Sequence, residues 1–348
     1  MNLSRIIQAA LTGILSLIIS FGVISCNSSE NKGKEERVQV AVVTNNPEEF
    51  WSIAEVGAKK AGSDFNVDVI FRKPEKGDVA VQMDIVNTVV QTGVSGVAIS
   101  VISPADQTTD LKQIAKKANL ITMDNDAPNS ERICYVGTDN YLAGKAVGKL
   151  VKEVIPEGGD IAIFVGQITP DNAKQRFQGV VDELADQKDA KGPQYGKYKL
   201  YRGEAITDGA NPEEAQIQAG NALEALKDQP SIAMVGLWAY NTPAILEAAR
   251  AKKLTGKVKI VGFDEYTQTL NGIEAGDVYA TVVQDPYNFG YKSVEILAAE
   301  ARGDKSKRAK TAVPHRIITK TGIDPETKKK DRLTVKEFQD NVNKLLGK

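Results

Sequence analysis

The stretch VQVAVVTNNPEEFW, from Val38 to Trp51, sets a pattern that the rest of the chain repeats. Its apolar first half, rich in β-branched residues, is typical of a buried parallel strand. An Asn-Asn-Pro turn then ends the strand, just before a segment of helical period that runs to about Asp64. Ligands of open α/β sheets bind outside the carboxyl ends of the strands. We therefore expect Asn46, Phe50 and Trp51 to face a small-molecule site.

Strand-like and helix-like segments alternate in this way through most of the chain. The expected strands after the first are 67–71, 96–100, 120–123, 133–136, 160–165, 198–202, 232–236, 258–262 and 280–284. The expected helices are 78–91, 106–118, 141–154, 172–186, 212–226, 242–251 and 287–301. This alternation predicts parallel sheets with right-handed connections. Since 348 residues exceed one ordinary core and the second series repeats the first, we expect two similar doubly wound α/β lobes.

Composition and charge argue against several classes of function. The 44 basic and 45 acidic residues leave a net charge of -1, which favours neither a nucleic acid nor an anionic membrane surface as a partner. The one histidine, His315, lies outside the strand-end loops, which argues against serine or cysteine triads and histidine-ligated metals. No phosphate-binding loop, dinucleotide fingerprint or EF-hand spacing is present. We expect no metal, no cofactor and no enzymatic activity.

The first 25 residues have the outline of a secretory signal peptide. They end in Val-Ile-Ser before Cys26, which resembles the bacterial lipobox and predicts a lipidated N-terminus at that cysteine, followed by a polar tether over 26–36. The alternative is an uncleaved membrane helix, since the apolar run is just long enough to span a bilayer. The lipobox predicts an exported protein, periplasmic or at the cell surface, that contacts the membrane through its anchor only.

Polar and aromatic side chains follow most of the expected strands. These candidate ligand-binding residues are Asn46, Phe50, Trp51, Asp124, Asn125, Trp238, Tyr240, Asn241, Asp264 and Gln284. Carboxylates and amides can each bind two vicinal hydroxyls, and a flat aromatic ring can cover the C–H face of a sugar. The set therefore predicts a site for a sugar or polyol. The alternative for any one residue is a helix cap or a core aromatic.

At these residues the chain resembles the bacterial periplasmic sugar-binding proteins of the ribose-binding type, which are the soluble components of ABC importers. The resemblance covers roughly residues 38–322. It rests on the order and spacing of VVTNNP with the following FW pair, ITMD at 121–124, YVGTDN at 135–140, VGFD at 261–264 and ATVVQ at 280–284. It implies the periplasmic binding protein type 1 fold, with Asn46, Phe50, Trp51 and Asp124 on the wall of the first lobe and Lys174, Tyr240, Asn241, Asp264 and Gln284 on the second lobe and hinge side.

Three departures from that family pattern leave the identity of the ligand open. Glu48 and Glu49 are two extra residues between the proline and the aromatic pair, and Asp124-Asn125 stands where the family has aspartate-arginine. Lys174, preceded by Asn172, stands where ribose binders carry a ligand-contacting arginine. Lysine and asparagine do not reproduce the planar five-donor fork of arginine, so the pocket is expected to bind a different arrangement of hydroxyls.

The resemblance also implies a discontinuous division of the chain. The first lobe comprises 37–138 and 286–312, the second 139–285 and 313–323, and a helical tail covers 324–348. Three crossings between the lobes form a hinge, and closure over a ligand is the expected motion. The implied function is capture of a monosaccharide or polyol by a monomeric lipoprotein that delivers it to an ABC permease. The alternatives are a ligand-sensing subunit for a chemoreceptor or sensor kinase and an enzyme acting on a sugar through paired acids such as Asp124 and Asp126.

Overall fold

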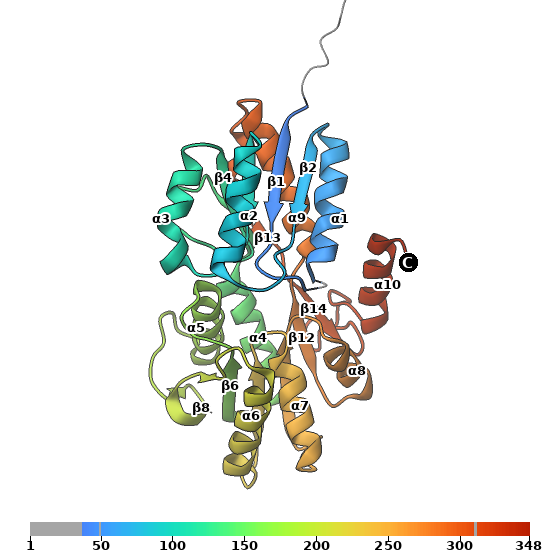
Figure 1. Cartoon of the computed structure of the whole chain (residues 1–348). Helices are drawn as coiled ribbons and strands as arrows, with labels where there is room; N and C mark the ends of the chain where they lie inside the picture. The colour runs from blue at the N-terminus through green and yellow to red at the C-terminus, as the bar shows by residue number, and fades with distance from the viewer. Residues whose placement is uncertain (1–36, 49, 310–311) are drawn as a thin grey trace, which may run out of the picture. The chain divides into compact units, whose positions relative to one another are not determined.

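The computed structural model describes residues 37–348 except residues 49, 310 and 311. The expected signal peptide at 1–25, the lipidation site at Cys26 and the tether that follows it lie outside the described residues. Within the described part of the chain, no helix combines the length and the apolar character that crossing a bilayer requires. Residues 37–348 form one compact unit, in which the described strands make two β-sheets (Figure 1).

The first sheet is parallel and has helices on both faces. Its strands lie in the order β13-β5-β4-β3-β1-β2. They are β1 (Gln39–Val43), β2 (Asp68–Arg72), β3 (Gly96–Ile99), β4 (Asn119–Met123), β5 (Tyr135–Thr138) and β13 (Ala312–Val313). Its helices are α1 (Phe50–Asp64), α2 (Val79–Gln91), α3 (Pro104–Ala115) and α9 (Pro286–Ala301). Val40 and Val42 pack with α1 and α9, whereas Ala41 and Val43 pack with α2 and α3. Burial on both faces explains why β1 reads as an unbroken apolar run.

The second sheet repeats this arrangement. Its strands lie in the order β14-β12-β11-β10-β6-β8-β7, and β9 also pairs with β6. They are β6 (Gly159–Val165), β7 (Gln194–Tyr195), β8 (Tyr198–Leu200), β9 (Ile206–Thr207), β10 (Ile232–Gly236), β11 (Val258–Phe263), β12 (Ala280–Val283) and β14 (Arg316–Thr319). Helices α4 (Asn140–Val154) and α5 (Asp171–Ala185) cover one face. The other face is covered by α6 (Pro212–Leu226), α7 (Asn241–Ala251), α8 (Thr267–Ala275) and α10 (Val335–Leu346). Only β14 and β7 run antiparallel to their neighbours in the described sheet.

The chain passes between the two sheets at three places. It leaves the first sheet after β5 and enters α4, returns after β12 into α9, and crosses again between β13 and β14 (Figure 1). The expectation of two doubly wound α/β lobes joined by three connections is therefore confirmed. The residue limits assigned above to each lobe and to the tail stay a prediction.

The structure differs from the predicted elements mainly where elements are short. The structure contains five elements that were not expected from the sequence, namely α8, β7, β9, β13 and β14. The strand expected over 198–202 ends at Leu200, because Arg202 has a φ of 60° and lies in a short 3-10 helix. The strand expected over 133–136 is shifted to Tyr135–Thr138. Two to nine residues carry too little hydrophobic periodicity to be recognised, and sheet pairing with distant segments decides their conformation.

The predicted C-terminal helix is present as α10. A capping box formed by Thr334 and Glu337 starts it, and Gly347 ends it with a φ of 68°. Val335 and Phe338 are buried in the core that covers the second sheet. Residues on another side of α10 line the cavity at the strand ends.

Candidate functional site

A cavity of about 1170 Å³ lies at the carboxyl ends of strands from both sheets, and we call it the strand-end cavity. The predicted ligand-binding residues that line it are Asn46, Phe50, Trp51, Asp124, Asn125, Asn172, Trp238, Tyr240, Asp264 and Gln284. They come from turns far apart in the sequence, which the parallel order of the strands brings to one place. The structure thus places all but two of the predicted side chains around one space.

Lys174 and Asn241 are the two that do not line the cavity. Asn172 and Arg176 lie one turn apart on α5 and line it, whereas Lys174, between them, is exposed on another side of the helix. Asn241 is buried behind the wall: its Oδ1 accepts a hydrogen bond from the Trp238 backbone N–H at 3.0 Å. Its Nδ2 donates to Asp208 at 2.8 Å. Asn241 therefore orients the wall rather than facing the cavity.

Two aspartates stand at corresponding strand ends, Asp124 after β4 and Asp264 after β11. Both have left-handed backbones, with φ of 59° and 61°, a conformation that non-glycine residues rarely adopt and that is common at binding sites. The Ser100 hydroxyl donates to the Asp124 carboxylate at 2.9 Å, and the Gln284 side-chain amide donates to the Asp264 carboxylate at 3.0 Å. Each carboxylate is thus held in place at the cavity wall.

Arg176 is the cation of the strand-end cavity, and the sequence analysis missed it. Its side chain is 3% exposed, donates to Asn140 at 2.8 Å and to the Leu237 carbonyl at 3.0 Å, and lies 3.8 Å from the centre of the Phe263 ring. A β-carbon on Gly144 of α4 would come within 2.2 Å of the Arg176 carbonyl oxygen. The glycine lets α4 and α5 approach closely, which carries the guanidinium to the cavity.

Burial perturbs the ionisation of the acids that line the cavity. Burial raises the pKa of Asp124 to about 6, although the hydrogen bond from Ser100 and the charge of Arg176 oppose the rise. Burial also raises the pKa of Asp264, against the charge of Arg176. The pKa of Glu265 rises to about 8, because it is buried and adjacent to Asp264. Acidic groups outnumber the single arginine, so the cavity disfavours anionic ligands.

The two tryptophans differ in how much of their rings is exposed at the cavity. Trp51 is 2% exposed, packs edge-on against Phe50 and donates from its indole to Asn45 at 3.1 Å, so it belongs largely to the core of the first sheet. Trp238 is half-buried and packs edge-on against Tyr240. The indole nitrogen of Trp238 is buried without a hydrogen-bond partner. Phe50, which is half-buried, presents more of its ring to the cavity than Trp51 does.

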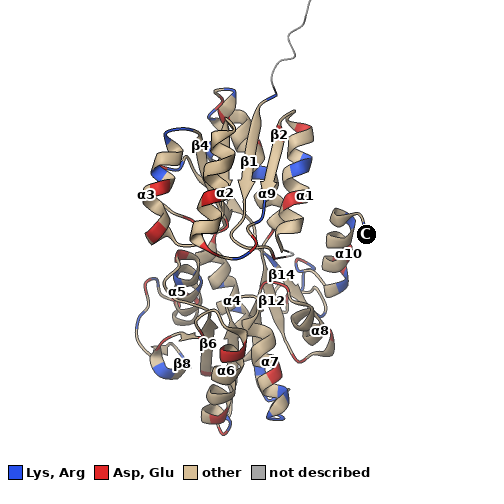
Figure 2. Ribbon diagram, in the orientation of Figure 1, with Lys and Arg blue, Asp and Glu red and all other residues tan. Residues whose placement is uncertain are grey.

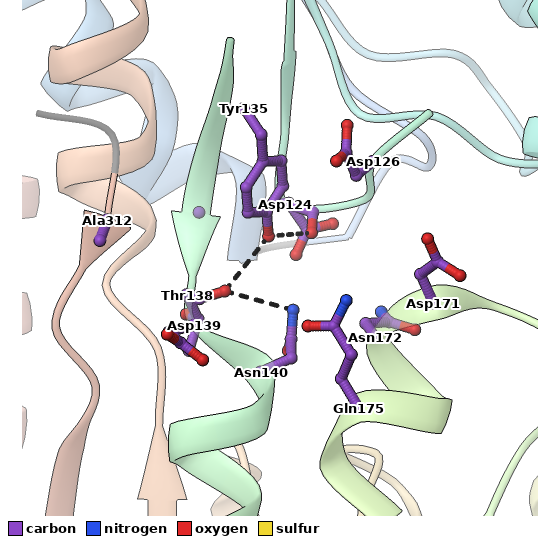
Figure 3. A pocket seen from close by; sticks show the side chains of 11 residues that line it. Asp124, Asp126, Tyr135, Thr138, Asp139, Asn140, Asp171, Asn172, Gln175 and Ala312 are labelled. Carbon is purple, nitrogen blue, oxygen red and sulfur yellow. Dashed lines mark hydrogen bonds between the residues drawn. The ribbon is translucent and has the colours of Figure 1, made fainter. Parts of the chain in front are cut away.

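A smaller cavity of about 250 Å³ adjoins the crossing after β5 (Figure 3). Here Tyr135 donates to the Asp124 backbone carbonyl at 2.7 Å, and the Asn140 amide donates to the Thr138 carbonyl at 3.2 Å. Asp126, which also lines this cavity, is held by two hydrogen bonds from Arg132, at 2.5 and 2.6 Å. This pairing disfavours the reading of Asp124 and Asp126 as a catalytic acid and base. Among the described residues, no group of three or more histidine, cysteine and acidic side chains could hold a metal ion.

Asp124→Asn is expected to be more stable than the unliganded wild type at pH 7, with an advantage that shrinks as the pH falls. The folded-state pKa of Asp124, about 6, exceeds that of the unfolded chain. The ionised carboxylate therefore destabilises the fold fully above that pH. Most of the effect is lost by pH 4, where the folded-state carboxyl is protonated and the unfolded-state carboxyl is about half protonated. Urea unfolding between pH 4 and 7 measures the difference. An advantage of Asp124→Asn that does not change with pH would contradict this explanation.

Comparison with known proteins places the fold in a family. Residues 40–305, more than half of the chain, match the periplasmic binding protein domain. The ribose import binding protein RbsB of Escherichia coli (strain K12) is 24% identical over 314 residues, which cover 88% of this chain and 98% of that protein. The structure of GanP, a glucose-galactose binding protein from Geobacillus stearothermophilus, is similar with a TM-score of 0.73 at 25% identity, covering 82% of this chain and 99% of that one.

A third similar structure is that of a XylFII-LytSN complex, with a TM-score of 0.69 at 23% identity, covering 82% of this chain and 99% of the other. The matches span nearly the whole length of these proteins. The chain therefore belongs to the family of periplasmic binding protein domains.

Proposed function

We propose that this protein is an extracytoplasmic receptor that binds a neutral monosaccharide or polyol in the strand-end cavity and delivers it to an ABC import permease. The observation that carries this proposal is the meeting of Asp124, Asp264 and Arg176 with amide and aromatic side chains around one cavity. Similar proteins include a ribose import binding protein and a glucose-galactose binding protein. The proposed role is binding, and it requires neither catalysis nor a cofactor.

The chemistry of the lining suits a ligand with several hydroxyl groups. Each carboxylate can accept hydrogen bonds from two neighbouring hydroxyls, and the guanidinium can donate to ring or hydroxyl oxygens. Phe50 and Trp238 offer ring surfaces for the C–H faces of a sugar. An anionic sugar would meet uncompensated carboxylates, so a neutral ligand is favoured. Because the lining comes from both sheets, a bound ligand would hold the two lobes together, with the three connections acting as the hinge.

A thermal-shift screen of monosaccharides and polyols tests this function. A ligand present at a hundred times its Kd should stabilise the protein by about 2.7 kcal/mol. Titration calorimetry of each positive compound then gives the affinity. If no sugar or polyol raises the melting temperature or produces heat, the proposal is wrong.

We also propose that the receptor is anchored through lipid on Cys26, as a monomer. Basic and acidic residues are interspersed along the helices (Figure 2), which does not favour nucleic acid or an anionic membrane surface as a partner. The lipid, rather than surface charge, would then hold the protein at the membrane.

Cys26→Ser is expected to move the protein from the membrane fraction to the soluble fraction and to abolish labelling by radioactive palmitate. The reason is that the sulfur of Cys26 is the proposed attachment point of the lipid. Cys134→Ser is the matched control, because Cys134 is a free cysteine buried beside the first sheet. Its localisation should not change. Intact mass of the wild type that still includes Met1 would contradict the anchor.

The second candidate is a sensing role, which the similar XylFII-LytSN complex favours, because a protein of this fold is there bound to another protein. Uptake measurements separate the two functions. If the protein serves an importer, deleting its gene should abolish accumulation of the radiolabelled ligand. If it is a sensor, the same deletion should leave uptake unchanged and abolish the transcriptional response to the ligand.

A further inference from the structure

The strand-end cavity extends beyond the side chains assigned to ligand binding. Its outer part is lined by residues of α8 and α10, and by the residue just before α8. They are Tyr266, Thr267, Leu270, Phe338, Gln339, Asp340, Val342, Asn343 and Leu346. At about 1170 Å³ the whole cavity exceeds the roughly 300–1,000 Å³ of pockets that enclose drug-sized molecules. The inner group of acids, amides and aromatic rings therefore leaves the outer part of the cavity available for more of the ligand.

The outer wall is chemically similar to the inner one. Gln339, Val342, Asn343 and Leu346 have the spacing i, i+3, i+4 and i+7, which puts them along one side of α10. This side alternates amides, which can donate to and accept from hydroxyls, with aliphatic side chains. Tyr266, directly before α8, also lines the cavity and is 39% exposed, one of few large hydrophobic side chains with so much exposed surface among the described residues.

α10 is fixed in place, so its cavity side is a wall and not a loose tail. Phe338 is buried in the second-sheet core, and the Arg316 guanidinium lies 5.8 Å from the centre of its ring. The same guanidinium donates to the Gln284 carbonyl at 3.0 Å, and the Gln284 side chain in turn donates to Asp264. α10 also contacts α1 of the first sheet. The helix is thus joined to the segment that holds the inner carboxylate.

We propose that the outer wall is a second sugar subsite and that the preferred ligand is a disaccharide. Its inner ring lies against Asp124 and Asp264, and its outer ring lies between Tyr266 and the amide side of α10. An aromatic or aliphatic surface for the C–H face and amides for the hydroxyls are what a second ring requires. This inference rests on the proposed sugar-binding function and enlarges the proposed ligand from one sugar ring to two.

Calorimetry with matched sugars tests the second subsite. The full-length protein is titrated with glucose, galactose, xylose, arabinose and ribose, and with cellobiose, maltose, lactose and xylobiose. One disaccharide is expected to bind roughly tenfold or more tightly than either of its monosaccharides. Asn343→Ala should weaken binding of that disaccharide roughly three- to tenfold, and Tyr266→Ala should weaken it roughly tenfold. Neither substitution should change the affinity for monosaccharides.

Asn341→Ala is the matched control, since Asn341 lies on the same helix, is exposed and does not line the cavity. It should leave both affinities unchanged. The second subsite is wrong if monosaccharides bind and every disaccharide binds equally well or worse. It is also wrong if Asn343→Ala has the same affinities as Asn341→Ala. In both cases the proposed function stands. If Asn343→Ala weakens the binding of monosaccharides as much as that of disaccharides, the placement of an outer sugar ring against α10 is also wrong. If no sugar binds at all, the proposed function fails and the subsite with it.

Discussion

Asp264→Ala is expected to weaken sugar binding by about 30- to 1000-fold, which corresponds to about 2–4 kcal/mol. The carboxylate stands at the end of β11, held by Gln284, and can accept hydrogen bonds from two ligand hydroxyls. Charge-assisted bonds in a closed, desolvated site are strong, and their loss leaves ligand hydroxyls unpaired. Folding should survive, because the burial of this carboxylate is unfavourable to its ionised form.

Titration calorimetry of wild type, Asp264→Ala and Asp264→Asn measures this loss. The asparagine variant keeps one acceptor and should lie between the other two. Asp331→Ala, at an exposed position away from the cavity, is the control and should bind as the wild type does. Trp238 lines the cavity, so binding should also change the intrinsic fluorescence. Near-wild-type affinity in Asp264→Ala would mean that the site lies elsewhere.

Arg176→Met is expected to abolish measurable sugar binding and to destabilise the protein by about 3–5 kcal/mol at pH 7. Methionine approximates the apolar stem but removes the positive charge that lowers the pKa of Asp124 and of Asp264. Both folded-state pKa values should then rise further above those of the unfolded chain. A group with a raised acid pKa destabilises the fold above that pKa, so the destabilisation should shrink as the pH falls from 7 to 5.

Lys174→Met provides the matched comparison two residues away on the same helix. Lys174 is exposed and outside the cavity lining, so this variant should keep both stability and affinity. Denaturant unfolding at pH 5 and 7, with calorimetry at pH 7, distinguishes the two positions. Equal losses in both variants, or a loss in Arg176→Met that is independent of pH, would contradict the role assigned to the arginine.

The local pattern of the sequence was sufficient for the fold class and for most of the side chains that line the inner part of the strand-end cavity. Asp124 and Asp264 each follow an apolar run that can only be a strand buried on both faces. In a parallel sheet the carboxyl ends of all strands lie at the same edge, so the residues that follow the strands of one sheet had to lie near one another. The meeting of Asp124 with Asp264 depends in addition on the arrangement of the two sheets. The same logic located Asn46 and Gln284, because strand ends are defined by neighbours in the chain.

Only the tertiary structure decided which side chains on helices face the cavity. Lys174 and Arg176 are equally polar in the sequence, and the choice between them depends on the rotation of α5, which the close contact of Gly144 on α4 with α5 sets. The indole of Trp51 is covered by the packing of α1 and α9, although its place beside a strand end suggested a ligand platform. The amides of α10 lie far from every strand end in the sequence. They reach the cavity because Phe338 is buried against the second sheet, and burial of an apolar side chain against a distant surface leaves no local signal.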